Sequence, residues 1–102
     1  MDDLQRIKRL VLRGHVLFTQ KAEDEMDHDD LDEELVCESI LNAPSIAKRL
    51  RSRNPKTSKA EYLYVIVGVT FDGVAVYTKG KILKSGDREV FYVLVSSKKS
   101  TS

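Results

Sequence analysis

Hydrophobic residues recur at helical spacing at the start of the chain. Leu4, Ile7 and Leu10 lie three residues apart, while lysines and arginines occupy positions between them. This spacing places apolar side chains on one face of a helix and charged ones on the other. The pattern therefore predicts a helix that ends at Gly14, followed by an extended segment over residues 15–19.

Two further helices are predicted before the first proline. The hydroxyl of Thr19 can cap a short helix over residues 20–26. A third helix is predicted to begin at Asp30, which precedes Glu33 by three residues as in a capping box. Pro44 prevents this helix from continuing.

After this proline the hydrophobic period changes to two, which is the spacing of β-strands. Asp72-Gly73 and Ser85-Gly86 are typical of the two-residue turns that join antiparallel strands. Helices first and hairpins afterwards predict an α+β fold, in which N-terminal helices pack on one face of a three- to four-stranded antiparallel sheet. The predicted strands span residues 46–51, 61–71, 74–84 and 88–97, and a polar loop spans residues 52–59.

The two turns also predict which side chains face the helices. A two-residue turn fixes the register of a hairpin, and residues paired across it share a face. For the first hairpin this register pairs Val67 with Thr78 on the apolar face, which we expect to be the core. The expected core face carries Leu63, Val65, Val67, Val69, Phe71, Val74, Val76, Thr78, Gly80, Ile82, Phe91, Val93 and Val95.

The opposite face of the predicted sheet mixes tyrosines with cations. Aromatic rings stack on bases, and lysines and arginines neutralise phosphates, so this face suits single-stranded nucleic acid. Lysines and tyrosines are also common on any solvent-facing sheet, so that interpretation stays open. The face is expected to carry Tyr62, Tyr64, Ile66, Gly68, Tyr77, Lys79, Lys81, Leu83, Arg88, Tyr92, Leu94 and Lys98.

Composition places the chain among globular domains. Its 102 residues are 41% hydrophobic and 32% charged, which predicts one domain over residues 1–102. No apolar run approaches the roughly 18 residues that cross a bilayer, and the start of the chain is too acidic for a signal peptide. We therefore expect a cytoplasmic protein with no membrane contact.

The formal net charge of +1 conceals a strong segregation of charge. Residues 15–42 hold ten acids against one lysine, whereas residues 43–102 hold twelve lysines and arginines against four acids. Such asymmetry indicates a polyanionic partner or an acidic interaction surface. An accidental segregation of surface charge is the alternative.

Conventional catalytic motifs are absent from the sequence. It contains no phosphate-binding glycine loop and no Ser-His-Asp order. One cysteine, Cys37, cannot form an internal disulfide, and with His15 and His28 it is too little for a zinc site, so no cofactor or metal is expected. Lysines and tyrosines remain, and these can act on RNA by proton transfer, charge stabilisation and base positioning.

Four short motifs spread over nearly the whole chain carry a family resemblance. They are Leu4-x-x-Ile7-Lys8-x-Leu10-Val11-x-x-Gly14, Phe18-Thr19-x-x-Ala22, Ser39-Ile40-Leu41 and Val93-Leu94-Val95-Ser96-Ser97-Lys98. Together they resemble the motility quorum-sensing regulator (MqsR) toxins and the small domains grouped near them in the RelE-like superfamily. The resemblance implies a RelE-like fold and a type II toxin, an mRNA interferase that cleaves mRNA without metal and is neutralised by a cognate antitoxin protein.

The resemblance also implies site residues. Lys48 and Lys98 match catalytic lysines of these toxins, and Tyr77 is expected to position the substrate. The cleavage would proceed by attack of a 2′-hydroxyl on the adjacent phosphate. A homodimer or a toxin-antitoxin hetero-oligomer is expected. One alternative function is a non-catalytic RNA- or protein-binding module on the same fold. Another is an interaction protein that acts through its acidic helices. Contacts to RNA are expected from Arg49, Arg51, Tyr64, Lys79, Lys81 and Arg88.

Overall fold

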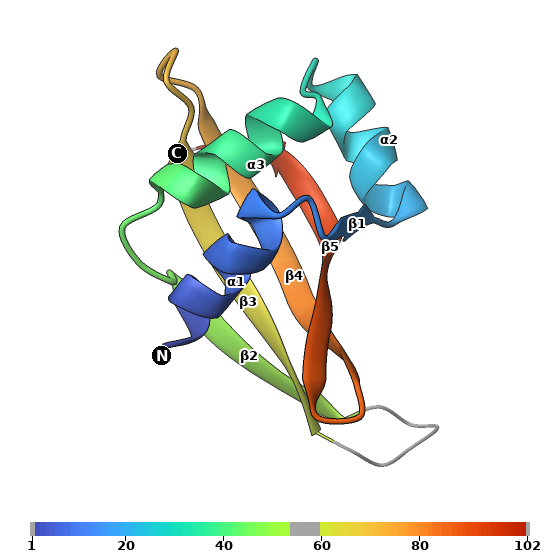
Figure 1. Cartoon of the computed structure of the whole chain (residues 1–102). Helices are drawn as coiled ribbons and strands as arrows, with labels where there is room; N and C mark the ends of the chain where they lie inside the picture. The colour runs from blue at the N-terminus through green and yellow to red at the C-terminus, as the bar shows by residue number, and fades with distance from the viewer. Residues whose placement is uncertain (1, 54–59, 102) are drawn as a thin grey trace.

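Three helices and a five-stranded mixed sheet make up the part of the chain that the computed structural model describes, residues 2–53 and 60–101 (Figure 1). This confirms the α+β fold class. The predicted loop over residues 52–59 lies largely outside the described residues. The helices are α1 (Asp3–Leu12), α2 (Gln20–His28) and α3 (Glu33–Asn42), and the strands are β1 (Val16–Phe18), β2 (Lys48–Arg53), β3 (Ala60–Val69), β4 (Ala75–Ser85) and β5 (Arg88–Lys99).

The strand order is β1-β5-β4-β3-β2, and β1 runs parallel to β5 while all other neighbours are antiparallel. The prediction of three to four antiparallel strands is therefore wrong. The extended segment after α1 pairs Val16 with Tyr92, far away in sequence, through a connection that includes two helices. A parallel pair lacks the local turn signal that a hairpin has, so the sequence pattern does not indicate it.

The helix starts follow from short polar side chains. The prediction that Thr19 caps the second helix is confirmed, because its hydroxyl accepts a hydrogen bond from the Ala22 amide at 3.2 Å. The third helix begins later than predicted. Its cap is Asp32, whose carboxylate accepts from the Leu35 amide at 2.8 Å, whereas Asp30 adopts a positive φ of 58° in the turn before it.

The hairpin between β3 and β4 has a loop one residue longer than predicted. The Thr70 amide donates to the Val74 carbonyl at 2.9 Å, and the Gly73 amide donates to the Thr70 carbonyl at 2.9 Å. Gly73 has a φ of 89°, as expected for a three-residue loop that ends in a left-handed glycine. The loop therefore spans residues 71–73, and the predicted two-residue turn is wrong.

This one residue inverts the faces of β3, because successive side chains of a strand point to opposite sides. Ile66 pairs with Thr78, and both are fully buried under the helices. Val67 pairs with Tyr77 on the other side. The predicted placement of β4 is confirmed, whereas Leu63, Val65, Val67 and Val69 face away from α1 and α3, and Tyr64, Ile66 and Gly68 face toward them.

The second hairpin also differs from its prediction. Ser85 pairs with Arg88, so the turn residues are Gly86 and Asp87, and Gly86 has a φ of 62°. The register between β4 and β5 shifts twice more, between Leu83 and Lys84 and between Lys79 and Gly80 of β4. As a result Tyr92 and Leu94 are the fully buried apolar residues of β5, and the prediction of Phe91, Val93 and Val95 as core is wrong.

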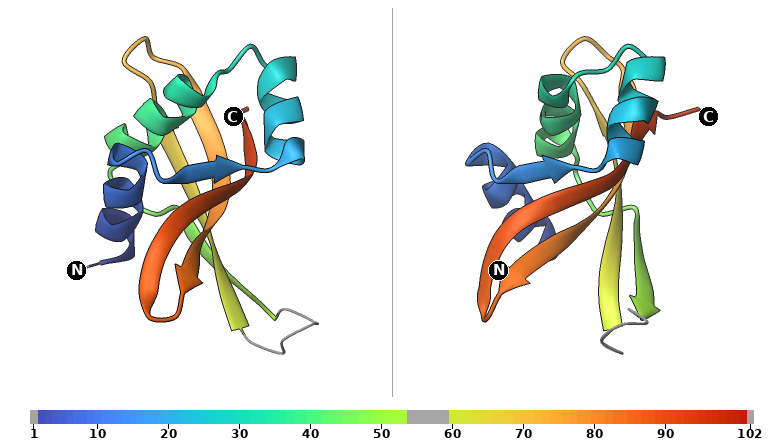
Figure 2. Two further views of the ribbon diagram at one scale, coloured as in Figure 1. Left: turned by 45° about the vertical axis from the view of Figure 1, so that its right-hand side comes forward. Right: turned by 90° about the vertical axis from the view of Figure 1, so that its right-hand side faces the viewer.

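Helix α3 lies directly on the backbone of β3. A Cβ atom added to Gly68 would lie 1.8 Å from the Ser39 carbonyl oxygen, so only glycine permits this approach. On the neighbouring strand, a Cβ at Gly80 would lie 2.6 Å from the ring of Tyr92. These two glycines let the helix and the tyrosine ring fill the space over the centre of the sheet. Figure 2 shows α3 lying across that face of the sheet.

Helix α2 closes the outer edge of β5 beyond the end of β1. Glu25 accepts from the Ser97 amide at 3.1 Å and from the Ser96 hydroxyl at 2.8 Å. One turn later Asp29 accepts from the Lys99 amide at 2.8 Å. Two carboxylates of the acidic helix thus satisfy backbone donors that an edge strand otherwise exposes.

Replacing Ile66 with Asp should prevent folding, because an unpaired carboxylate would be buried beneath the helices. Val67→Asp should change the free energy of unfolding by about 1 kcal/mol or less, since that side chain lies on the partly exposed face. Thermal melts followed by circular dichroism measure both effects. The reverse ranking of the two variants would contradict the observed register.

Tyr92→Phe should stabilise the protein by about 1 kcal/mol, because the Tyr92 hydroxyl is buried without a hydrogen-bond partner among the described residues. Burial also raises the pKa of Tyr92 above its ordinary value, and the nearby Tyr64 adds to this. The unfolded chain therefore loses this proton first, and wild-type stability should fall as the pH rises above about 10. Chemical denaturation from pH 7 to 11 should show a smaller loss of the free energy of unfolding for Tyr92→Phe than for wild type. Tyr62→Phe is the control, at a tyrosine that is 45% exposed, and should lose as much as wild type.

Candidate nucleic-acid interface

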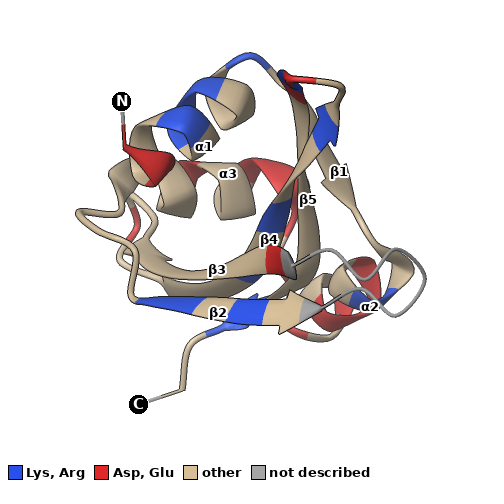
Figure 3. Ribbon diagram, turned by 90° about the horizontal axis from the view of Figure 1, so that it is seen from below, with Lys and Arg blue, Asp and Glu red and all other residues tan. Residues whose placement is uncertain are grey.

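One face of the sheet is not covered by α1 or α3, which both lie on the other side of β3 (Figure 3). We call it the open face. The register of the strands assigns residues to it, because paired residues share a face. The open face carries Lys48, Leu50, Val65, Val67, Tyr77, Lys79, Lys81, Val93, Ser96 and Lys98.

Two lysines flank an apolar position at the centre of the open face. Lys48 of β2 and Lys79 of β4 both pair with Val65 of β3, from opposite sides. Val65 is only 7% exposed although no helix of the core covers it. Long aliphatic stems shield apolar neighbours while their ammonium groups stay in water, so two cations border a hydrophobic patch here.

A tyrosine and a lysine form the next row. Tyr77 and Lys98 are register partners on β4 and β5, and the Lys98 ammonium lies 5.5 Å from the centroid of the Tyr77 ring. This is a cation–π contact, which holds a positive charge against an aromatic face. The pair thus combines the two groups that single-stranded nucleic acids require, a ring for stacking and a cation for phosphate.

The open face becomes more apolar toward β1. Lys81 pairs with Val93, which in turn pairs with Leu17 of β1, whose side chain is 44% exposed. Lys81 also forms an ion pair with Glu61, with 3.7 Å between Nζ and Oε2. Both side chains are about one-third exposed, so water screens the pair and it contributes little to stability. Leu17 was not predicted at this face, since its neighbour comes from the far end of the chain.

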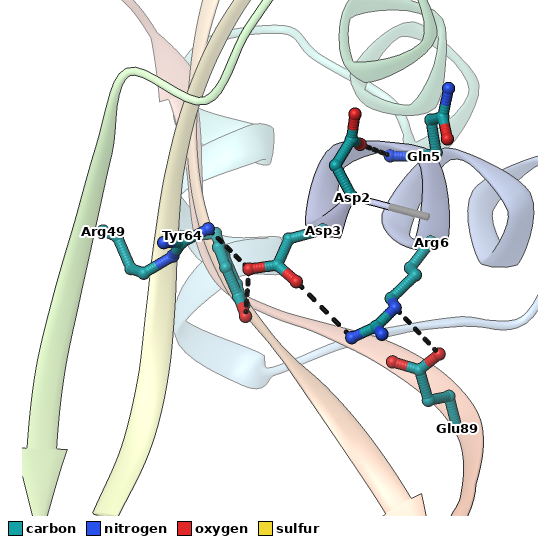
Figure 4. Close-up of polar contacts among 7 residues, drawn as sticks. All are labelled: Asp2, Asp3, Gln5, Arg6, Arg49, Tyr64 and Glu89. Atoms are coloured by element: carbon teal, nitrogen blue, oxygen red, sulfur yellow. Dashed lines mark hydrogen bonds and ion pairs between the residues drawn. The ribbon is translucent and has the colours of Figure 1, made fainter.

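Arg49 and Tyr64 lie on the opposite face, where they hold α1 (Figure 4). Asp3 accepts from the Arg49 guanidinium and from the Tyr64 hydroxyl, the latter at 3.2 Å. Arg6 continues this network, 3.5 Å from Asp3 and 3.8 Å from Glu89. Burial raises the pKa of Tyr64, and the Asp3 carboxylate adds to this. The expectation that Tyr64 faces solvent is therefore wrong, and Arg49 already binds a carboxylate.

The other two predicted residues, Arg51 and Arg88, lie apart from Tyr77 and Lys98. Arg51 is exposed, pairs with Tyr62 and lies on the same side as Arg49. Arg88 begins β5 and lies beside the arginines of α1. Of the nine predicted site residues, the open face therefore brings together Lys48, Tyr77, Lys79, Lys81 and Lys98, and the helix side holds Arg49, Arg51 and Tyr64. Arg88 stands at the end of the sheet, where it pairs with Ser85 and borders a pocket with the arginines of α1.

Two other reactive groups lie apart from the lysines and Tyr77 of this face. Cys37 is on α3, and His15 stands at the β1 side of the face, two residues before Leu17. Burial raises the pKa of the Cys37 thiol to about 11, with a further contribution from the Glu33 carboxylate, so the thiol stays protonated at neutral pH. The ring of His15 packs against Phe91 at a centroid distance of 5.8 Å. Within residues 2–53 and 60–101, histidines, cysteines and acids form no group of three that could hold a metal ion.

Helix length and comparison with known proteins add no independent indication of function. In the described part of the chain, every helix is too short or too polar to cross a membrane. No family model matches the chain, and neither a curated protein nor a solved structure matches it.

Proposed function

We propose that this chain is a RelE-like endoribonuclease, the toxin of a type II toxin-antitoxin pair, which binds single-stranded mRNA on the open face. One observation carries this proposal. Lys48, Tyr77, Lys79 and Lys98 come from three strands and meet on one face that α1 and α3 leave uncovered. Lys48 and Lys98 are also the lysines that match the MqsR toxins, so their presence on one face supports the same function.

The open face suits RNA binding through two kinds of contact. Lys79 and Lys98 neutralise phosphates, and each neutralised phosphate releases counterions. The Tyr77 ring offers a surface on which a base stacks, and such stacking tolerates every base. Leu17 on the same face, 44% exposed, gives the sugar and base an apolar surface.

Cleavage follows from proton transfer by lysines. The 2′-oxygen of the RNA forms a bond to the adjacent phosphorus, and the bond from phosphorus to the 5′-oxygen breaks. One lysine, as the free amine, accepts the 2′-hydroxyl proton, and another as the ammonium stabilises the phosphorane and protonates the departing 5′-oxygen. The products are a 2′,3′-cyclic phosphate and a 5′-hydroxyl. We assign these roles to Lys48 and Lys98, and substrate positioning to Tyr77.

A non-catalytic RNA-binding module on the same fold is the second candidate. It is favoured by the positions of Lys48 on β2 and Lys98 on β5. These strands are three spacings apart in the sheet, or about 14 Å at the usual strand separation. Side chains anchored so far apart bind neighbouring phosphates more easily than they act on a single one.

Lys48→Ala and Lys98→Ala should each reduce RNA cleavage about a hundredfold or more, the usual scale for losing an acid–base group. His15→Ala and His28→Ala should leave the rate unchanged, and so should a chelator, because the proposed step uses lysines. The measurement is cleavage of a fluorescent single-stranded RNA by purified protein. Undiminished cleavage by both lysine variants, or no cleavage by wild type, would exclude the nuclease and leave the binding module.

The double variant Lys79→Gln/Lys81→Gln should weaken binding of single-stranded RNA without unfolding the protein. Because each lost phosphate contact removes about 0.7 from the slope of log K against log salt, the slope should decrease by up to about 1.4. Fluorescence anisotropy at several salt concentrations measures this. Lys21→Gln, on the acidic helix α2, is the matched control and should keep the wild-type slope; an equal effect there would show that binding does not use the open face.

A further inference from the structure

A pocket of about 240 Å³ lies on the helix side of the sheet, between α1 and the start of β5. It is separate from the open face, since α1 packs on the other side of the sheet. Arginines dominate its wall, and a single carboxylate accompanies them. The lining residues are Arg6, Arg9, Leu10, Arg13, Arg88 and Glu89.

The fold gathers these arginines from two distant segments. Arg6, Arg9 and Arg13 are three and four residues apart, which places them on one face of α1. Arg88 approaches them from the β4–β5 hairpin. Four arginines and one glutamate give the wall a formal charge of +3.

Three of the four arginines have no partner among the described residues. Arg6 lies 3.8 Å from Glu89 and 3.5 Å from Asp3. Among the described residues, Arg9, Arg13 and Arg88 have no ion pair or side-chain hydrogen bond. Arginines near the end of α1 complement the helix dipole, but Arg88 is on a strand and has no such role. These three arginines are exposed to solvent, so their guanidinium groups are free to bind an external anion.

Phosphate groups fit this wall best. Guanidinium groups bind phosphate oxygens through paired, charge-assisted hydrogen bonds. Each phosphate group carries about −1.5 to −2 near neutral pH, so two of them match the charge of the wall. The volume is below the range of about 300–1,000 Å³ that holds drug-sized ligands, which favours the phosphate groups alone over a whole nucleotide.

We propose that this pocket binds a di- or triphosphate group. The same chemistry is found at the 5′ end of an RNA and in free nucleotides or inorganic pyrophosphate. The assignment goes beyond the proposed nuclease and does not depend on it, because it uses none of the residues of the open face.

The test is calorimetric titration of the full chain with inorganic pyrophosphate at low salt. Arg9→Gln/Arg13→Gln and Arg88→Gln should each weaken binding about tenfold or more, since each removes charge-assisted contacts. Glu89→Gln should tighten binding several-fold, because it removes the one negative charge of the wall. Lys21→Gln, on α2 and outside both proposed sites, is the control and should bind as wild type.

Short RNAs with a 5′-triphosphate or a 5′-hydroxyl distinguish the two sources. Tighter binding of the triphosphate, lost in Arg88→Gln, identifies an RNA end; equal binding of both RNAs with retained pyrophosphate binding identifies a free phosphate. Absence of pyrophosphate binding, or binding that folded Arg88→Gln and Glu89→Gln leave unchanged, would overturn the assignment. If the double variant Arg9→Gln/Arg13→Gln fails to fold, the single variants Arg88→Gln and Glu89→Gln still decide the test. Pyrophosphate binding without RNA cleavage would refute the nuclease alone.

Discussion

The close contact between Gly68 and Ser39 fixes which residues of the sheet face solvent. Helix α3 can lie on β3 only where the side chain beneath it is a hydrogen atom, and Gly68 is the glycine in that strand. The hairpin loop is held in the matching register, because the Phe71 amide donates to Glu38 of α3 at 2.6 Å. With Gly68 turned toward α3, the register of β4 places Tyr77 and its neighbouring lysines on the open face. Packing on one side thereby determines chemistry on the other.

Local patterns in the sequence predict the helices, the Thr19 cap and the two hairpins, since each depends on neighbouring residues. They do not predict the face of β3, because this strand is apolar on both sides. Asp72-Gly73 fits a two-residue and a three-residue loop equally well, and one residue inverts the strand. The pairing of β1 with β5 cannot be predicted from local sequence for a different reason, because no turn connects these two strands directly.

The candidate site was predictable where a strand alternates strictly. In β4, Tyr77, Lys79 and Lys81 alternate with buried or partly buried residues, so their common face follows from the sequence. Arg49 could not be assigned in this way, because its partner Asp3 is 46 residues away. The arginine spacing on α1 is visible in the sequence, but Arg88 joins it only through the fold.

The carboxylates of α2 also affect how copies of this chain can meet. Growth of a fibre by strand pairing between molecules needs two free sheet edges on every molecule. Along β5, β1 pairs with Tyr92 to Leu94, and Glu25 and Asp29 bind the amides of Ser97 and Lys99. The remaining long edge is β2, whose lysine and arginines would face the same cations of a second copy. Open-ended growth through the long strands is therefore resisted, and the three-residue β1 is the short edge on the other side of the sheet.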